Sequence, residues 1–338
     1  MAKKESTLTY DVVLRSVKER QFKPIYYLMG EESYYIDRIA DYIANNVLTE
    51  EQKDFNFTTL YGAETDINAV LMAARRYPMM SDYQVILVKE AQNLKNLDPL
   101  SVYLKNPQPQ TILVFCHKNG VLDGRKKVAG DIAQAGFLFE SKKLYERDLP
   151  PFIAGYVQRK GMTIDGKSVE LLVDYIGSDL NRMASELDKL AIKGDKRITP
   201  ELIEQNIGVS KDFNIFEFRS ALINKDIFKA NRIVNYFDKN QKEYPIQKVL
   251  SALFSYFSNL MVAHYAPYRT EAGVKDVLDL RIPWQVKDYM LGMRNFSARK
   301  TMSIIAAIRE TDAKSKGFGN SMATSGELLQ ELIYFILH

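Results

Sequence analysis

Residues 24–33 read PIYYLMGEES, and this stretch decides the fold of the first part of the chain. The run from Ile25 to Met29 is apolar or aromatic and favours a strand, and Gly30 permits a tight turn. From residue 33 to about 47 apolar side chains recur at helical spacing. Nucleotide-binding proteins place their phosphate loop in such a strand, turn and helix. The stretch therefore predicts the architecture of a nucleotide-binding domain.

The chemistry of a phosphate loop is missing from this turn. A working loop needs several glycines whose amides wrap the phosphates, then a Lys and a Ser or Thr that binds magnesium. Here Gly30 is followed by Glu31 and Glu32, which would repel a triphosphate. The two acids could form a metal or acid–base pair, but the favoured interpretation is a capped helix start. We expect a degenerate phosphate loop with no catalytic residue, cofactor or metal.

The composition indicates an ordinary globular protein. A chain of 338 residues, 46% hydrophobic and 26% charged, predicts two or three domains. The net charge of +4 is compatible with a nucleic acid nearby but too weak to indicate one. A single cysteine, Cys116, excludes an internal disulfide and fits a reducing cytoplasm, and the three histidines are too scattered for a zinc site. Neither a signal peptide nor a membrane span is expected.

Strand and helix patterns alternate up to about residue 140, which predicts a parallel α/β sheet with helices on both faces. The expected strands are 24–29, 55–61, 84–89, 111–116 and 137–139, and the expected helices are 6–19, 33–47, 66–76, 98–105 and 126–135. The first helix should bury Leu8, Val12, Val13 and Val17. Tyrosines at 26, 27, 34 and 35 could stack on bases, but packing of a helix onto the sheet is the favoured interpretation.

The rest of the chain shows helical periodicity and no convincing strand. A junction is expected at Leu149-Pro150-Pro151. Ser178 should cap the helix that follows Gly177, and Thr199 should cap the next. Beyond residue 211 the expected helices are 213–223, 226–239, 245–265, 285–293, 297–316 and 323–337.

Four stretches, in this order and spacing, make the chain resemble the delta subunit of the bacterial DNA polymerase III clamp loader. They are residues 24–37, the sequence YPMMSD at 77–82, the sequence GSDLNRMASELDKL at 177–190 and the sequence FNIFEF at 213–218. The resemblance covers essentially the whole chain. It implies an α/β AAA+-like domain at 1–140 with a clamp-binding tip, an all-α lid domain at 141–210 and an all-α collar domain at 211–338.

The resemblance also implies a function. Delta subunits bind the ring-shaped sliding clamp, beta, and open it for loading onto primed DNA during replication, without ATP hydrolysis of their own. The collar would join the ATPase subunits, gamma or tau, and delta-prime. The chain would then be a subunit of a DNA-directed DNA polymerase holoenzyme, a nucleotidyltransferase complex, in the cytoplasmic replisome of a bacterium.

The clamp-binding tip is expected at Arg76, Tyr77, Pro78, Met79 and Met80. Pro78 should end the preceding helix, and turn residues follow before a buried strand, so a loop projects between them. By the resemblance, apolar side chains here fill a pocket on the clamp. The alternative is that Met79 and Met80 pack under the sheet, as methionines commonly do.

A DNA contact is possible at Arg125, Lys126 and Lys127, although a short basic cluster is more often a solvated helix start. Cys116 and His117 should point to opposite faces of a strand and so form no nucleophile–base pair. The alternatives to a clamp-opening subunit are an active P-loop NTPase, a free single-strand DNA binder, and another AAA+ adaptor or clamp-loader subunit that binds DNA or partners without opening the clamp. A delta-prime subunit with a cysteine-ligated zinc does not fit one cysteine.

Overall fold

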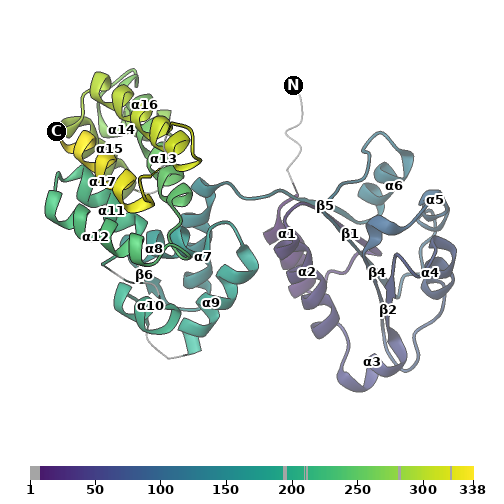
Figure 1. Ribbon diagram of the computed structural model, residues 1–338. Helices are drawn as coiled ribbons and strands as arrows, with labels where there is room; N and C mark the ends of the chain where they lie inside the picture. The colour runs from purple at the N-terminus through teal and green to yellow at the C-terminus, as the bar shows by residue number, and fades with distance from the viewer. Residues whose placement is uncertain (1–7, 193–195, 209, 211, 281–282, 320–321) are drawn as a thin grey trace. The chain divides into compact units, whose positions relative to one another are not determined.

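The computed structural model describes residues 8–192, 196–208, 210, 212–280, 283–319 and 322–338 (Figure 1). The chain divides into two compact units, Met1–Leu144 and Tyr145–His338. The start of the helix expected from residue 6 lies outside the described residues.

The first unit is built on a five-stranded parallel sheet, as expected. Its strands are β1 (Ile25–Gly30), β2 (Phe57–Tyr61), β3 (Gln84–Lys89), β4 (Thr111–Lys118) and β5 (Phe137–Ser141), in the order β2-β3-β4-β1-β5. All six residues of β1 are buried, because β4 and β5 flank the strand and helices cover both faces of the sheet.

The helices of this unit lie on both faces of the sheet (Figure 1). One face packs against α1 (Tyr10–Lys18) and α2 (Ser33–Asn46), and the other against α4 (Ile67–Ala74), α5 (Asp98–Tyr103) and α6 (Lys127–Ala135). Tyr26 and Tyr27 are both fully buried but belong to the cores on opposite faces, so packing accounts for both rings. Val12 was expected on the buried side of α1, yet it is 46% exposed, whereas Val13 and Val17 are buried and Leu8 and Tyr10 pack partly against the same core.

Several boundaries in the first unit differ from the sequence-based prediction. The helix expected at 98–105 ends two residues early, at Tyr103, and β4 and β5 each end two residues later than expected. A helix, α3 (Glu50–Asn56), precedes β2, so the strand begins at Phe57 rather than Phe55. The Thr49 hydroxyl and the Gln52 side chain form a reciprocal capping box that starts this helix, which outweighs the alternating pattern around Phe55. The next helix, α4, starts at the expected Asp66 cap and ends at Ala74, two residues early. A short 3₁₀ turn, η1 (Ala91–Asn93), follows β3.

The second unit begins with a small helical group. It contains η2 (Glu146–Asp148), α7 (Leu149–Arg159), α8 (Gly166–Ile176), α9 (Leu180–Ile192) and α10 (Pro200–Ile207). The expectation of no strand was wrong, because β6 (Thr163–Ile164) and β7 (Arg197–Ile198) pair in parallel. Asp179, not Ser178, caps α9 by accepting the amide of Arg182, whereas Thr199 caps α10 as predicted.

Most of the remaining helices form one bundle around a shared apolar core, and the helix at Glu271–Val277 packs in a smaller cluster with Ala263 and Val286. The remaining helices are α11 (Ile215–Ile223), α12 (Ile227–Lys239), α13 (Ile246–His264), α14 (Glu271–Val277), α15 (Pro283–Asn295), α16 (Ala298–Ser315) and α17 (Ser325–Leu337). The sequence did not predict α14, which Thr270 starts by accepting the amide of Gly273. The overall class, an α/β domain followed by helical domains, is confirmed, and the finer division at residues 140 and 210 stays a prediction.

Candidate partner-binding site

The loop from Arg75 to Tyr83, between α4 and β3, projects apolar side chains into solvent. Tyr77 is 76% exposed, Met79 60% and Met80 98%, so neither methionine packs under the sheet. Arg76 is also exposed and Pro78 is half-buried. The structure therefore brings all five residues expected at the tip into one exposed loop, and we call Arg76 to Met80 the apolar tip.

The base of the apolar tip is fixed by Asn56, at the end of α3. The amide N–H of Met79 donates to Oδ1 of Asn56 at 2.6 Å, and Nδ2 of Asn56 donates to the carbonyl of Met79 at 2.8 Å. The Asn56 residue is only 4% exposed. One side chain thus satisfies both backbone polar groups of a residue whose own side chain is solvated.

A second buried polar group holds the other end of the tip. Nε2 of Gln84, the first residue of β3, donates to the carbonyl of Arg76 and to Oγ1 of Thr111, the latter at 2.7 Å. The Thr111 hydroxyl donates in turn to the carbonyl of Ala74 at 2.8 Å. These bonds satisfy the carbonyls freed where α4 ends. Sequence reasoning missed Asn56, Gln84 and Thr111; a polar residue at the head of each apolar strand was the available signal for the last two.

Met80 adopts a left-handed backbone conformation, with φ of +52°. This conformation is uncommon for a residue with a side chain and persists where surrounding contacts impose it. The bonds to Met79 just before it supply such contacts. The tip is therefore an ordered turn with its apolar side chains outward.

The turn after β1 is closed by the chain itself. Gly30 has φ of +130°, and the next amide, that of Glu31, donates to the carbonyl of Ser141 at 3.1 Å. The Ser141 hydroxyl donates to the carbonyl of Glu32 at 2.8 Å, and the Glu32 carboxylate accepts the amide of Tyr34 at 3.1 Å. Glu32 is buried and caps α2, as expected of a helix start, whereas Glu31 is exposed. Among the described residues, no group of three His, Cys, Asp or Glu side chains could hold a metal ion.

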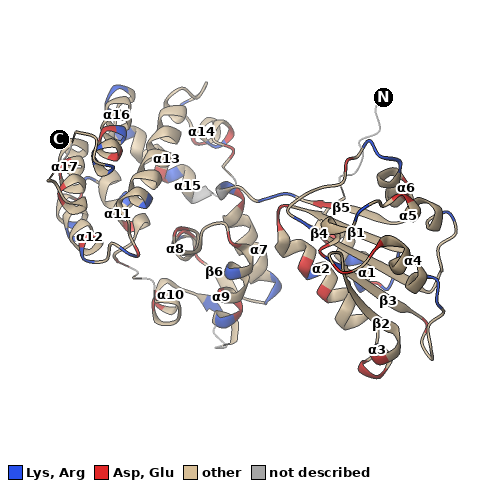
Figure 2. Ribbon diagram, turned by 45° about the vertical axis from the view of Figure 1, so that its right-hand side comes forward, with Lys and Arg blue, Asp and Glu red and all other residues tan. Residues whose placement is uncertain are grey.

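The basic cluster at 125–127 lies exposed at the start of α6. Arg125 forms an ion pair with Asp123, with Nε 2.9 Å from Oδ1, and its side chain is 91% exposed. Figure 2 shows basic and acidic residues interspersed along both units. Any contact of Arg125, Lys126 and Lys127 with DNA stays a prediction.

Cys116 and His117 point to opposite faces of β4, as expected. Cys116 belongs to the core under α1 and α2, where burial raises the pKa of its thiol to about 12. His117 lies on the other face, with Nδ1 3.0 Å from the Tyr27 hydroxyl, and burial lowers the pKa of its imidazole. A protonated thiol and an imidazole on the far side of the sheet form no nucleophilic pair.

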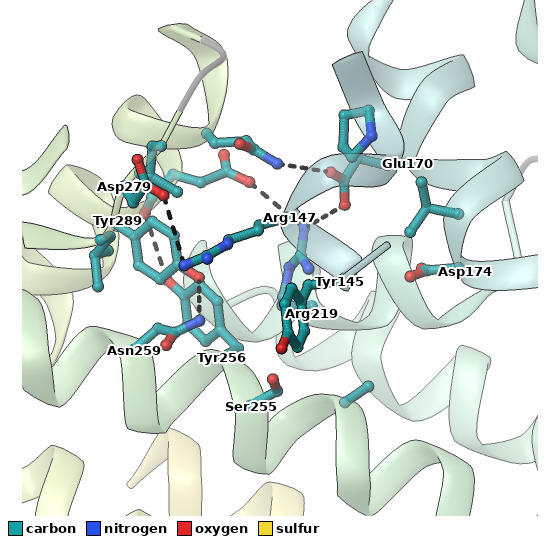
Figure 3. Close-up of a pocket in the computed structure, with 17 residues that line it drawn as sticks. Tyr145, Arg147, Glu170, Asp174, Arg219, Ser255, Tyr256, Asn259, Asp279 and Tyr289 are labelled. Carbon is teal, nitrogen blue, oxygen red and sulfur yellow. Dashed lines mark hydrogen bonds and ion pairs between the residues drawn. The ribbon is translucent and has the colours of Figure 1, made fainter. Parts of the chain in front are cut away.

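The second unit contains a cavity of about 490 Å³ between α8, α11, α13 and α15 (Figure 3). Nη2 of Arg219 lies 3.1 Å from Oε2 of Glu170 and 3.9 Å from Oδ2 of Asp288. Burial alone would lower the pKa of Arg219, but the surrounding acids raise it above its ordinary value. Tyr256 and Tyr289 stack with ring centroids 5.2 Å apart. Arg219 is thus paired with carboxylates of the chain itself, and these contacts connect α8, α11 and α15.

Comparison with known proteins identifies the sheet-bearing unit. Residues 26–142 match the family described as "DNA polymerase III, delta subunit", a range that includes β1 to β5 and the apolar tip. The chain is 25% identical over 318 residues to DNA polymerase III subunit delta of Bacillus subtilis, covering 90% of this chain and 91% of that protein. The chain is a homologue of the DNA polymerase III delta subunit. It is thus related to a component of a replicative polymerase complex.

Two further comparisons agree with this delta-subunit relationship. The probable DNA polymerase III subunit delta of Aquifex aeolicus is 22% identical over 312 residues, 86% of each chain. The solved structure of the B. subtilis DNA clamp loader delta protein matches with a TM-score of 0.54 and 23% identity, covering 97% of this chain and 99% of that one. The structural match establishes the shared fold. In the part of the chain that the structure describes, no helix is long and apolar enough to cross a membrane.

Proposed function

We propose that the chain is the delta subunit of a bacterial clamp loader and that its apolar tip binds and opens the sliding clamp. The observation that carries the proposal is the exposure of Tyr77, Met79 and Met80 on a loop whose backbone is held by buried polar side chains. Exposed apolar side chains on an ordered loop are costly in a free protein and typical of a partner contact.

Apolar burial at the tip supplies part of the energy of a specific contact. Fully burying one such side chain is worth about 1.5–3 kcal/mol, so three are worth about 4.5–9 kcal/mol before the costs of association. A micromolar contact needs about 8 kcal/mol net, so further contacts around the tip must contribute to it. The paired methionines would adapt to the shape of an apolar pocket on the clamp.

The proposal assigns no ATPase activity to this chain. In a phosphate loop, free backbone amides bind the phosphates. Here the amide of Glu31 donates to Ser141 and the amide of Tyr34 to Glu32, and both acids carry negative charge into the same turn. The energy for opening the clamp would therefore come from binding. A partner shifts the equilibrium between the closed and open clamp only by the difference between its affinities for the two forms.

The other parts of the proposal concern the complex. Residues 1–140 would act as the AAA+-like clamp-contacting domain, 141–210 as the lid and 211–338 as the collar that joins the ATPase subunits and delta-prime. ATP binding by those subunits would expose the tip to the clamp, next to primed DNA. The chain would act in the bacterial cytoplasm and catalyse no reaction alone.

The test is a direct binding titration of the purified chain with the sliding clamp of the same organism. Met79→Ala/Met80→Ala should weaken the affinity at least tenfold, because two apolar anchors are removed. Met302→Ala is the matched control: Met302 is 61% exposed, like Met79 at 60%, but lies on α16, so its replacement should leave the dissociation constant unchanged. Equal affinity of the double variant and the wild type would refute the site.

Two further readouts separate the alternatives. A clamp labelled across its subunit interface reports ring opening; binding without opening would favour an adaptor or another clamp-loader subunit. A titration with ATP and magnesium should show no saturable binding to the isolated chain. Saturable binding with turnover would favour the P-loop NTPase.

A further inference from the structure

Asn56 links two segments that lie 23 residues apart in the sequence. It is the last residue of α3, and its carboxamide bonds to the amide and the carbonyl of Met79. Its Nδ2 also donates to the carbonyl of Gln52, at 3.0 Å, so the same side chain completes the last turn of its own helix. The Asn56 carboxamide therefore fixes Met79 relative to α3.

The two bonds to Met79 matter because this residue lies outside the sheet. The loop that carries the apolar tip runs from the end of α4 at Ala74 to the start of β3 at Gln84, and Met79 lies in the middle of this loop. No strand pairing holds its backbone, and its side chain is 60% exposed. Without the carboxamide, the N–H and C=O of Met79 would bond to water and the tip would sample several conformations.

We propose that Asn56 is a positioning residue for clamp binding, which sets the apolar tip in its binding conformation before the clamp arrives. This inference rests on the function proposed above. A loop that is already ordered loses less conformational entropy on binding, so the same apolar contacts yield a higher affinity. Asn suits this role because its carboxamide offers one acceptor and two donors at one point, and all three bonds seen here use them.

The chain offers a matched control in Asn46. Asn46 is the last residue of α2, as Asn56 is of α3, and its Nδ2 donates to the carbonyl of Tyr42, four residues earlier, at 2.9 Å. Asn56 makes the equivalent bond to Gln52 and, in addition, holds Met79. Replacing each by Ala removes the same helix-end bond, and only Asn56→Ala removes the link to the tip.

The test combines clamp affinity with hydrogen exchange of the Met79 amide in the full chain. Asn56→Ala should weaken clamp binding about tenfold, the effect of losing one to two net hydrogen bonds, and should speed exchange of that amide by a similar factor. Asn56→Asp should also weaken binding, because a carboxylate accepts the N–H but cannot donate to the carbonyl. It preserves the shape of the side chain and serves if the alanine variant does not fold. Asn46→Ala should change neither quantity.

A double-mutant cycle separates positioning from a general loss of stability. In the Met79→Ala/Met80→Ala background, Asn56→Ala should have little further effect on clamp affinity, because it acts through those side chains. An undiminished effect there, or wild-type affinity of Asn56→Ala and Asn56→Asp together with faster exchange, would overturn the inference. The proposed clamp contact would still stand if the methionine variant alone weakened binding, and would fall if that variant bound as the wild type does.

Discussion

The guanidinium of Arg219 on α11 forms an ion pair with the carboxylate of Glu170 on α8, at 3.1 Å. A second ion pair joins the same two helices, with Lys167 on α8 lying 2.7 Å from Glu217 on α11. Here α8 carries the positive charge, whereas in the first pair it carries the negative one. The two carboxylate side chains are only 8% and 6% exposed. These reciprocal pairs connect the helices expected in the lid and in the collar within one compact unit.

Removing the positive charge of Arg219 should destabilise the second unit. In Arg219→Met the buried Glu170 carboxylate loses its cation, and breaking such a pair costs about 2–4 kcal/mol where, as here, some solvent reaches the Arg. The free energy of unfolding from urea denaturation checks this loss. Arg219→Lys keeps the positive charge and should lose less stability. Arg125→Met removes a charge from an exposed ion pair and should leave the midpoint of urea denaturation unchanged. A wild-type midpoint for Arg219→Met would contradict the role of the pair.

The stability contributed by Glu217 should depend on pH. Burial alone would raise the pKa of its carboxyl, but hydrogen bonds from Lys167 and Lys229 outweigh burial and lower the pKa below its ordinary value. A carboxylate with a lowered pKa in the folded state stabilises the protein above its unfolded-state pKa of about 4.3, and the contribution disappears as the pH falls through the folded-state pKa.

Glu217→Gln should therefore be less stable than the wild type at pH 7, and the difference should shrink below about pH 4.5. Urea denaturation of both proteins between pH 7 and the lowest pH at which they fold measures this difference. A difference that stays constant or grows as the pH falls would contradict the assignment.

Replacing Gly30 by Ala should destabilise the first unit strongly. A Cβ at Gly30 would lie 2.0 Å from the carbonyl oxygen of Ser141, and φ is +130°. Strain and steric overlap together predict a loss of about 3 kcal/mol or more. Gly130→Ala is the control, and its change in the free energy of unfolding should have the opposite sign. Nothing lies within 4 Å of a Cβ at Gly130, so an alanine inside α6 should stabilise the protein by about 0.5–1 kcal/mol. Thermal denaturation of both variants tests the pair; a stable Gly30→Ala would show that the turn can relax.

The sheet could be predicted from the sequence because its central strands are short apolar runs between helical patterns. The runs at 84–89 and 111–116 are nearly continuously apolar, which is typical of a parallel strand covered on both faces. The short elements could not be predicted in the same way. The strands β6 and β7 have two residues each, too few to show any period, and α3 depends on a capping box that a neighbouring strand-like pattern obscured.

The exposed loop that carries the apolar tip could be predicted from the sequence, but the contacts that hold this loop could not. Pro78 and the turn residues after it predict a loop locally. The bond from Asn56 to Met79 joins residues 23 apart, and Gln84 reaches Thr111 across 27 residues. No local pattern encodes such pairings, because they follow from how the strands assemble.

The closure of the turn after Gly30 by Ser141 has a consequence for variants of this loop. A variant that acquired a lysine and a threonine here would still have the Glu31 amide bonded to the last residue of β5. Freeing that amide for a phosphate would require the edge strand to withdraw as well, and with it the packing of Phe139 against the core under α2. Side-chain replacements alone would therefore not turn this loop into a phosphate-binding one, because the backbone of β5 would have to move too.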